Sequence, residues 1–390
     1  MKISNPEIVQ QHGNVLYRVS VDFSKGTQTL WYSLSAEFAP LVCDRSDAAL
    51  VALLIPAMAC GEDIYISGTV SEKLYYNLSV RYQYILQSLI PSLHLIKIYP
   101  SNVEPASYKA AGVAAGFSAG IDSFNVLSDH HYKEVPSGFR VTHLLYNNVG
   151  SHDKGGEHLF RERYIRLKSF VKERIKLPFV AVNSNLNDFY SLNFQQTHTS
   201  RNASVALLLQ GGIGRYMYAS CYDYANIFIG ATHCAAYSDP ITLPLLSTET
   251  LDAFSVGSEY TRIQKTLCVA DLEDSYKMLD VCVGAIDKAE NCSTCVKCLR
   301  TLLTLEIAGV LDRYQDVFNL ELYRRNRHSY ITNMLQSNDF FIREIIAFAE
   351  ERKFEFPLSS RLLASSSLVR QLAKPVRVAR NFYRRTNKIL

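Results

Sequence analysis

The sequence predicts an α/β protein with a parallel, doubly wound sheet, preceded by an N-terminal α+β module and followed by a C-terminal helical region. Short apolar segments alternate with amphipathic ones from residue 110 onward, which is typical of parallel strands joined by helices. Residues 1–105 lack this alternation, and the residues after 299 show helical spacing only. A chain of 390 residues is long enough for two or three domains. We therefore predict domains at residues 1–105, 106–299 and 300–390.

The N-terminal module combines strands and helices but contains no recognisable chemical motif. Strands, with alternation of apolar and polar residues clearest in the first, are predicted at residues 16–22, 29–33, 63–67 and 93–99. Helices that begin at a capping serine are predicted at residues 46–58 and 71–89. The module is either a platform for a substrate or partner, or a structural cap.

In the central region four strands alternate with three helices. The strands are predicted at residues 113–117, 141–147, 179–183 and 225–230. The helices are predicted at residues 123–131, 157–175 and 200–219. Ligands of such sheets bind at the carboxyl ends of the strands, so we expect the loops after the four strands to converge. Beyond them we predict a strand at residues 276–282 and helices at residues 301–308, 339–351 and 360–372.

The loop after the first central strand has the residue types of a phosphate site. Residues 117–124 read Phe-Ser-Ala-Gly-Ile-Asp-Ser-Phe, a strand that runs into a small-residue loop and then a helix. Backbone N–H groups of such a loop can bind an anion. Ser118 and Ser123 add hydroxyl donors, and the carboxylate of Asp122 could hold Mg²⁺ beside phosphate oxygens. The alternative is an ordinary strand–turn–helix in which Ser and Asp cap the helix.

This loop does not fit the two best-known nucleotide motifs. It lacks the Lys of the Walker pattern, and only Gly120 fits the dinucleotide fingerprint. It resembles the SGGxDS loop of the PP-loop ATP pyrophosphatases, which split ATP between the α and β phosphates and adenylate a substrate. By this resemblance ATP would contact the loop from Ala119 through Ile121. Ala119 replaces the first Gly of the motif, and Ala is costly where the backbone needs a positive φ.

Four cysteines form a second motif. Cys282, Cys292, Cys295 and Cys298 are spaced C-x9-C-x2-C-x2-C. Thiolates at this spacing in a chain without a secretory signal indicate a Zn²⁺ site. An iron–sulfur cluster, which also uses four thiolates, is the alternative. A closed four-cysteine zinc site has no open position for water, so its role would be structural.

Composition and charge bear on compartment and partners. The hydrophobic content of 48% is sufficient for packed cores, and no apolar run is long enough to span a bilayer. The N-terminus lacks a signal-peptide pattern, so we expect a cytoplasmic protein without a disulfide framework. The formal net charge is +4, yet no acidic residue follows Glu355. This basic end, residues 356–390, is either a contact for nucleic acid or a protein partner, or a solvated helix face.

The phosphate loop and the cysteines together resemble 7-cyano-7-deazaguanine synthase, the zinc-containing PP-loop family of deazapurine biosynthesis. Residues 291–301 look like the cysteine knuckle of that family, and residues 230–240 are similar to its substrate loop. Residues 261–266 lie where the family has a Lys before a helix. The resemblance implies ATP, Mg²⁺ and Zn²⁺, and a homodimer is the expected assembly. Related chains with added domains occur in anti-phage defence cassettes.

The resemblance implies adenylate chemistry. A carboxylate of a deazapurine-like substrate would attack the α phosphorus of ATP, pyrophosphate would leave, and ammonia or an amine would displace AMP. Asp122, Lys265 and His233 are the catalytic candidates, and Arg262 would help to offset charge on the leaving group. Lys265 could equally be an exposed helix residue without a role, and a loop histidine such as His233 is more often merely solvated. Asp239 shares the His233 loop and is a further candidate for substrate binding or proton transfer.

Two more polar positions are candidates for nucleotide contacts. Asn147 ends the second central strand, at an edge that often meets adenosine in this architecture. Arg201 lies in a segment expected to begin a helix, where free N–H groups and a guanidinium could hold a phosphate or carboxylate. The alternative for Arg201 is a surface residue on a capped helix.

Two other functions remain open from the sequence. One is a PP-loop amidotransferase or tRNA-modifying enzyme with another acceptor, for which Cys234 is the cysteine on a predicted site loop. The other is a non-catalytic, nucleotide-binding scaffold, which the replacement at Ala119 favours.

Overall fold

The computed structural model describes residues 1–24, 26–108, 110–151, 156–282 and 290–365. It divides into two compact units. Unit 1 comprises residues 1–280 and 286–289, and unit 2 comprises residues 281–285 and 290–390. The predicted boundaries at residues 105 and 299 are not boundaries between these units. Compact units and evolutionary domains are different divisions of a chain, so the predicted domains stay predictions.

Unit 1 is an α/β unit built on one eleven-stranded sheet, which confirms the predicted class. The strand order is β11-β10-β7-β8-β9-β4-β3-β1-β5-β6, with β2 paired to β3. The strands are β1 Lys2–Ile3, β2 Glu7–Gln11, β3 Asn14–Phe23, β4 Gly26–Ser35, β5 Ile64–Ser71, β6 Ile98–Glu104, β7 Gly112–Gly116, β8 His143–Asn148, β9 Phe179–Ser184, β10 Ile213–Ala219 and β11 Asp252–Val256.

The five strands from β7 to β11 form a parallel, doubly wound half-sheet. Counted along the chain, their spatial order is 3-2-1-4-5, and every neighbouring pair is parallel. The order reverses between β7 and β10, so the loops after these two strands leave in opposite directions. Such a switch point is where open α/β sheets bind ligands. The predicted phosphate loop follows β7 and therefore lies at this point.

The N-terminal half-sheet continues the same sheet rather than forming a separate one. Strand β4 pairs antiparallel with β9, through Tyr32 opposite Ser184 and Ser33 opposite Asn183. Long β3 and β4 pair over their whole length. Alternate residues of β3, among them Tyr17, Val19 and Val21, are buried. The first hundred residues thus extend the hydrophobic core of the parallel half-sheet.

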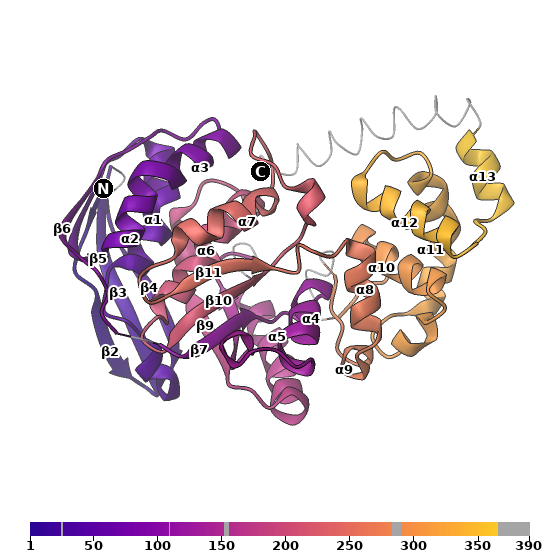
Figure 1. Ribbon diagram of the computed structural model, residues 1–390, viewed down its shortest axis with the longest axis horizontal. Coiled ribbons are helices and arrows are strands. Elements are labelled where there is room, and N and C mark those ends of the chain that lie inside the picture. Colours follow the sequence, from indigo (N-terminus) through magenta and orange to yellow (C-terminus); the bar gives the residue numbers. More distant parts are fainter. Residues whose placement is uncertain (25, 109, 152–155, 283–289, 366–390) are drawn as a thin grey trace. The chain divides into compact units, whose positions relative to one another are not determined.

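Helices cover both faces of the sheet in unit 1. In Figure 1, α1, α6 and α7 lie on one side of the strands, and α4 and α5 lie on the other. Almost all of α1 is buried because it is apolar on every side, and it packs on α6. The helices of unit 1 are α1 Asp47–Cys60, α2 Glu72–Asn77, α3 Gln83–Leu89, α4 Ile121–Leu127, α5 Glu157–Phe170, α6 Phe194–Leu208, α7 Asp239–Thr242, α8 Arg262–Ala270 and α9 Glu273–Tyr276.

The structure corrects several predicted elements. The expected helix at residues 200–219 is in fact the second half of α6 followed by strand β10, and the expected strand at 225–230 contains no strand. Strand β11, which completes the parallel half-sheet, was not predicted. No strand occupies 276–282, and β6 begins five residues later than the strand predicted from residue 93. Apolar runs in a sheet buried on both faces carry little periodicity, so helix and strand are easily confused there.

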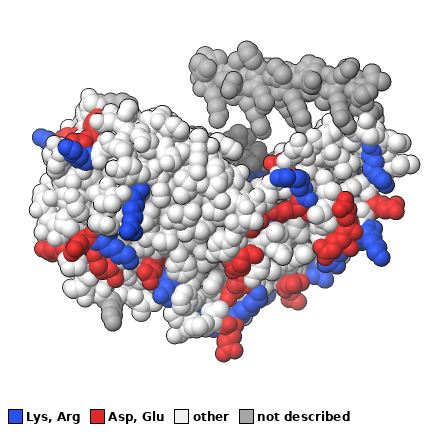
Figure 2. Space-filling model, turned by 45° about the horizontal axis from the view of Figure 1, so that its top comes forward, with Lys and Arg blue, Asp and Glu red and all other residues white. Residues whose placement is uncertain are grey.

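Unit 2 consists of helices packed beside the cysteine loop. Its helices are α10 Val296–Ile307, α11 Leu320–Met334, α12 Phe340–Glu351 and α13 Leu358–Ser365. An internal cluster ties two of them together, because Glu306 accepts hydrogen bonds from both Tyr323 and Arg327. The basic end that sequence analysis singled out lies largely at 366–390, outside the described residues. On the face shown in Figure 2, basic and acidic side chains are interspersed rather than gathered by sign.

Candidate functional site

The loop between β7 and α4 has the backbone shape that the motif led us to expect. Ala119 has a φ of +58°, in the left-handed region that favours glycine, and its side chain is fully buried. Gly120 is the N-cap of α4, and its carbonyl accepts a hydrogen bond from the N–H of Phe124. The Ala119 carbonyl accepts another from the N–H of Asp280. Ala119 therefore holds a strained conformation that neighbouring backbone groups stabilise.

Two cations converge on Asp122 in the first turn of α4. Arg262 Nη1 lies 2.8 Å from Asp122 Oδ1, and Arg262 Nη2 lies 3.0 Å from Oδ2. Lys265 Nζ lies 3.5 Å from Oδ1. The side chains of Arg262 and Lys265 are 10% and 1% exposed, against 30% for Asp122. One carboxylate thus faces two largely desolvated cations, which leaves this corner of the site with an excess of positive charge.

Lys265 is fixed by a residue at the end of β10. Its ammonium group donates hydrogen bonds of 2.7 Å to both the carbonyl and the hydroxyl of Ser220. Burial lowers the pKa of Lys265, an effect that the charge of Asp122 opposes. Burial also favours neutral Arg262, but Asp122 and Cys221 raise its pKa above the ordinary value. Both cationic side chains are buried and held in place by hydrogen bonds, so they are suited to bind an anion.

Gly257, directly after β11, places the end of a third strand beside Lys265. Its φ is +86°, and a Cβ atom there would lie 2.8 Å from Asn125 Oδ1 and 3.5 Å from Lys265 Nζ. Only glycine combines this backbone with so close an approach. The carboxyl ends of β7, β10 and β11 therefore meet around Lys265, as the parallel sheet requires.

The remaining residues of the loop differ in what they offer a ligand. The hydroxyl of Ser118 is exposed and makes no hydrogen bond to the described residues. The hydroxyl of Ser123 is buried and donates to the carbonyl of Gly120, at 3.0 Å. The side chain of Ile121 is buried, so only its backbone could contact a nucleotide. Ser118 is consequently the available hydroxyl donor of the predicted pair.

Arg201 is not at the start of a helix, which corrects the prediction. Helix α6 begins at Phe194, so residue 201 lies in its middle, where N–H groups are used within the helix. The guanidinium is buried, donates to Asn187 Oδ1 and the carbonyls of Val149 and Leu192, and stacks on Tyr190 at 3.7 Å. Its partners make Arg201 a cross-link between loops of unit 1.

Asn147 lies where the sequence predicted it, near the carboxyl end of β8. Its Nδ2 donates to Asn202 Oδ1 at 3.1 Å, and its own Oδ1 is buried without a hydrogen-bond partner in the described part of the chain. That unused acceptor suits a ligand N–H group at this edge of the sheet.

His233 and Asp239 have opposite environments although only five residues lie between them. His233 is exposed. Asp239 is 1% exposed and accepts a 2.6 Å hydrogen bond from the hydroxyl of Thr199. Burial raises the pKa of Asp239 to about 7. Cys234, in the same loop, is buried as well, and burial raises the pKa of its thiol to about 11, so this thiol stays protonated at neutral pH.

The structure adds residues that sequence analysis missed. Ser220, Cys221 and Gly257 border the Lys265 corner, with Cys221 Sγ 3.6 Å from Arg262 Nη2. They were missed because β10 and β11 were not predicted as strands, so their carboxyl ends were not recognised. The sequence signal that could have located them is a Ser or Gly directly after an apolar run, as at Ser220 and Gly257.

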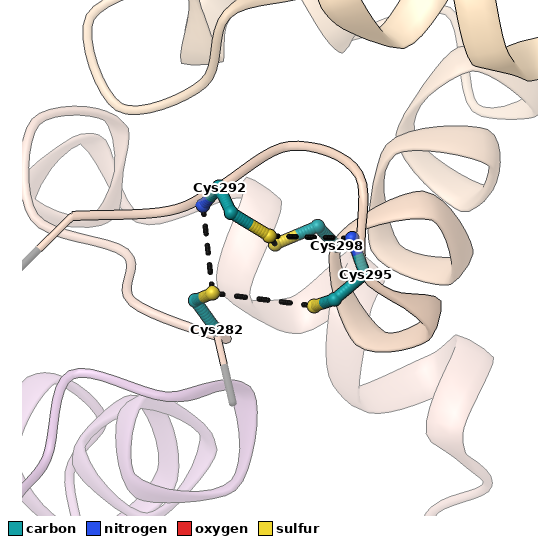
Figure 3. Close-up of side chains that lie close together, drawn as sticks. All are labelled: Cys282, Cys292, Cys295 and Cys298. Carbon is teal, nitrogen blue, oxygen red and sulfur yellow. Dashed lines mark hydrogen bonds between the residues drawn. The ribbon is translucent and has the colours of Figure 1, made fainter. Parts of the chain in front are cut away.

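The four cysteines gather into one group, as predicted. Their sulfur atoms all lie within 4.8 Å of one another, and the Cys282–Cys295 and Cys292–Cys298 pairs are both at 4.0 Å. Figure 3 shows Cys282 facing the loop that carries Cys292 and leads into a helix, which is α10. Cys295 is the N-cap of α10, and Cys298 lies in its first turn. Tetrahedral Zn–S bonds of about 2.3 Å place sulfurs about 3.8 Å apart. The group can therefore hold a metal ion such as zinc.

Backbone groups of unit 2 hold the cysteine loop in shape. The N–H groups of Cys292 and Cys295 point at sulfur acceptors, at 3.4 Å from Cys282 and 3.2 Å from Cys292. Asn291 accepts from the N–H of Val281 and donates to the carbonyl of Val317. Such hydrogen bonds orient metal ligands and offset thiolate charge.

Comparison with known proteins adds no family name. No protein-family model, curated protein or solved structure matches this chain. Within the described part of the chain, none of the helices has both the length and the apolar character needed to cross a bilayer.

Proposed function

We propose that this protein is an ATP-dependent ligase that adenylates a carboxylate and transfers the acyl group to nitrogen. The observation that carries the proposal is the convergence of Arg262 and Lys265 on Asp122, at the switch point of a doubly wound sheet. Two desolvated cations beside a loop of small residues are suited to a polyphosphate. Their position supports binding of the phosphates of ATP rather than of its base.

The proposed reaction proceeds in two steps. A substrate carboxylate oxygen attacks the α phosphorus of ATP, and the bond between that phosphorus and the bridging oxygen breaks to release pyrophosphate. A nitrogen nucleophile then attacks the acyl carbon, and AMP leaves with the bonding electron pair while the nitrogen loses a proton. Arg262 and Lys265 would neutralise charge that develops on the pyrophosphate. Ser118 and the N–H groups of the loop would orient it.

Mg²⁺ would accompany ATP and spread charge over its phosphates. Asp122 is the acidic side chain of the described loop that could ligate it. The carboxylate now faces Arg262 and Lys265, so phosphate oxygens would need to take over part of their pairing. Through this exchange of partners, Asp122 would couple the binding of Mg²⁺ to the binding of the phosphates.

The substrate proposal rests on the resemblance to 7-cyano-7-deazaguanine synthase. A deazapurine-like carboxylate would become an amide, or would be attached to a macromolecule, in biosynthesis or anti-phage defence. Conversion of the amide to a nitrile would require a second ATP, with the amide oxygen leaving on AMP. The scaffold alternative keeps the nucleotide but not the reaction, and the replacement of a motif glycine by Ala119 favours it. For the cysteine group we propose zinc rather than an iron–sulfur cluster, because four thiolates around a cluster lie farther apart than four around one ion.

Release of pyrophosphate from ATP, with candidate carboxylates and amines, tests the proposal. We expect Lys265→Met to reduce the rate at least about a hundredfold, as loss of a charge-stabilising group does. Lys277→Met, at an exposed lysine of unit 1, is the matched control and should keep the wild-type rate. ATP binding without pyrophosphate release from any carboxylate would support the scaffold. Equal rates in the two variants would contradict the proposed site.

A further inference from the structure

Asp239 is a buried acid whose charge is not matched by any described residue. It is 1% exposed, and Thr199 donates to its Oδ1. Its Oδ2 is buried and has no hydrogen-bond partner, and no described Lys or Arg forms an ion pair with it. An ionised carboxylate in such a place is costly unless a cation accompanies it.

The surroundings of Asp239 are aromatic and polar but not basic. Thr199 also lies 3.4 Å from Nδ1 of His198, which in turn bonds to the hydroxyl of Tyr218 at 2.7 Å. Burial, and then the charge on Asp239, raises the pKa values of Tyr216 and Tyr218. Burial lowers the pKa of His198 to about 4, so this imidazole is neutral and does not supply the missing positive charge.

These contacts restrict what can occupy the unused oxygen. A large ligand is excluded because Asp239, Thr199 and His198 are all more than nine-tenths buried. Divalent metals prefer several carboxylates or imidazoles, whereas no second carboxylate among the described residues acts on Asp239. A weakly hydrated monovalent cation needs few anionic ligands and is attracted to tyrosine rings and hydroxyls.

We propose that Asp239 binds a small monovalent cation, of the size and charge of ammonium or potassium, inside unit 1. Oδ2 is its anionic ligand, and the hydroxyl of Thr199, which already bonds to Oδ1, lies beside it. The cation converts an unpaired buried carboxylate into a paired one. It thereby stabilises the packing of α6 against α7 and the loop after β10. This site is separate from Asp122 and does not depend on the proposed ligase reaction.

Cation binding requires ionised Asp239, so the pKa of this carboxyl determines the pH range in which the site binds a cation. The folded pKa of about 7 lies above the ordinary value of 3.8, so protonated Asp239 favours the folded state. That stabilisation is present at low pH and is lost as the pH rises toward 7. A bound cation replaces the proton above that pH. The titratable groups that the charge of Asp239 reaches are Tyr216 and Tyr218 on β10, Tyr82, and Cys234. His198 on α6 lies beside Thr199, and the charge of Arg201 acts on His198 and not on Asp239.

Thermal unfolding of the full chain in different chloride salts at constant ionic strength tests the site. At about pH 8 we expect the midpoint to rise saturably with ammonium or potassium, but not with sodium or tetramethylammonium. Because the cation competes with a proton, its affinity should fall roughly tenfold for each pH unit below 7. A response to ammonium alone would identify an amine site, and a response to both ions a potassium-type site.

Asp239→Asn provides the second arm of the test. Asn keeps an acceptor for Thr199 but carries no charge, so the variant should fold and lose the cation response. Asp44→Asn, at an exposed acid of unit 1, should keep it. Equal shifts with all four salts would show that no selective cation site exists at Oδ2, and a response that survives in Asp239→Asn would show that the cation binds elsewhere; either result overturns the proposal. The salt series on the wild-type chain decides the matter even if Asp239→Asn fails to fold.

Discussion

The phosphate loop of unit 1 and the cysteine group of unit 2 were both found as short sequence motifs, yet they are assembled differently. The cysteine group takes three of its four sulfurs from one stretch of seven residues, Cys292 to Cys298. The charged corner at Asp122 joins residues about 140 positions apart, since Arg262 and Lys265 come from α8. Its shape depends on the sheet that brings the ends of β7, β10 and β11 together.

This difference implies that the two sites lose their structure for different reasons. The proposed metal site would depend on its ion, because four thiolates within 4.8 Å repel one another when no ion holds them. The Asp122 corner depends on charge balance between distant elements, because Lys265 is almost completely buried. Removing the metal, the balancing charge or the backbone strain should therefore affect the stability of the two regions differently.

Metal removal should have the largest effect, and it should be confined to unit 2. A zinc chelator, or Cys298→Ser, is expected to lower the stability of this unit by more than about 5 kcal/mol, because metal binding and folding are coupled in such sites. Hydrogen exchange should show loss of protection in α10 and α11 while β7 to β10 keep theirs. The exposed Cys60 provides the control Cys60→Ser.

Elemental analysis sharpens the same comparison. One zinc per chain and no visible absorption would support a single zinc ion. Iron together with sulfide would instead indicate an iron–sulfur cluster. Unchanged exchange in α10 and α11 after complete removal of the metal would rule out a structural role for it.

Removing the balancing charge at Asp122 should have the second largest effect. Asp122→Leu leaves Arg262 and Lys265 without their carboxylate, and we expect a loss of about 3 kcal/mol in the free energy of unfolding. Lys265→Met keeps the Asp122–Arg262 pair and should cost less than about 1 kcal/mol, since a buried cation is replaced by an apolar side chain of similar length. Urea unfolding of both variants measures the difference. Equal losses would mean that Asp122 does not balance the two cations.

Relief of backbone strain should have the smallest effect. Ala119→Gly removes the cost of an L-residue at a φ of +58°, partly offset by the greater freedom of glycine in the unfolded chain. We expect a gain of about 0.5 to 1 kcal/mol in the free energy of unfolding. Ala115→Gly, in the buried strand β7, is the opposite control and should destabilise. A loss of stability in Ala119→Gly would show that the Ala119 methyl group contributes more by packing than the strain costs.

The accuracy of the sequence predictions followed the locality of the signal. The alternation of β3, the apolar helix α1 and the spacing of the cysteines were read correctly because each depends on neighbouring residues. The predicted capping by Ser46 was wrong, because its side chain makes no cap hydrogen bond to the described residues. Residues 200–230 were misread because the Ala-, Leu- and Tyr-rich stretch there changes from helix to strand without a periodic signal. That error moved Arg201 to a helix start and hid Ser220.

The sequence by itself determined the parallel α/β class, the left-handed residue in the loop after β7 and the four-cysteine group. Short-range sterics and ligand spacing decide these features, and both are written in consecutive residues. Only the tertiary structure decided that Arg262 and Lys265 meet Asp122 and that Arg201 is a buried cross-link. It also decided that no described residue supplies a partner charge to Asp239. The physical reason is that pairing and burial of a charge depend on which strands are neighbours, and strand order is not a local property of the chain.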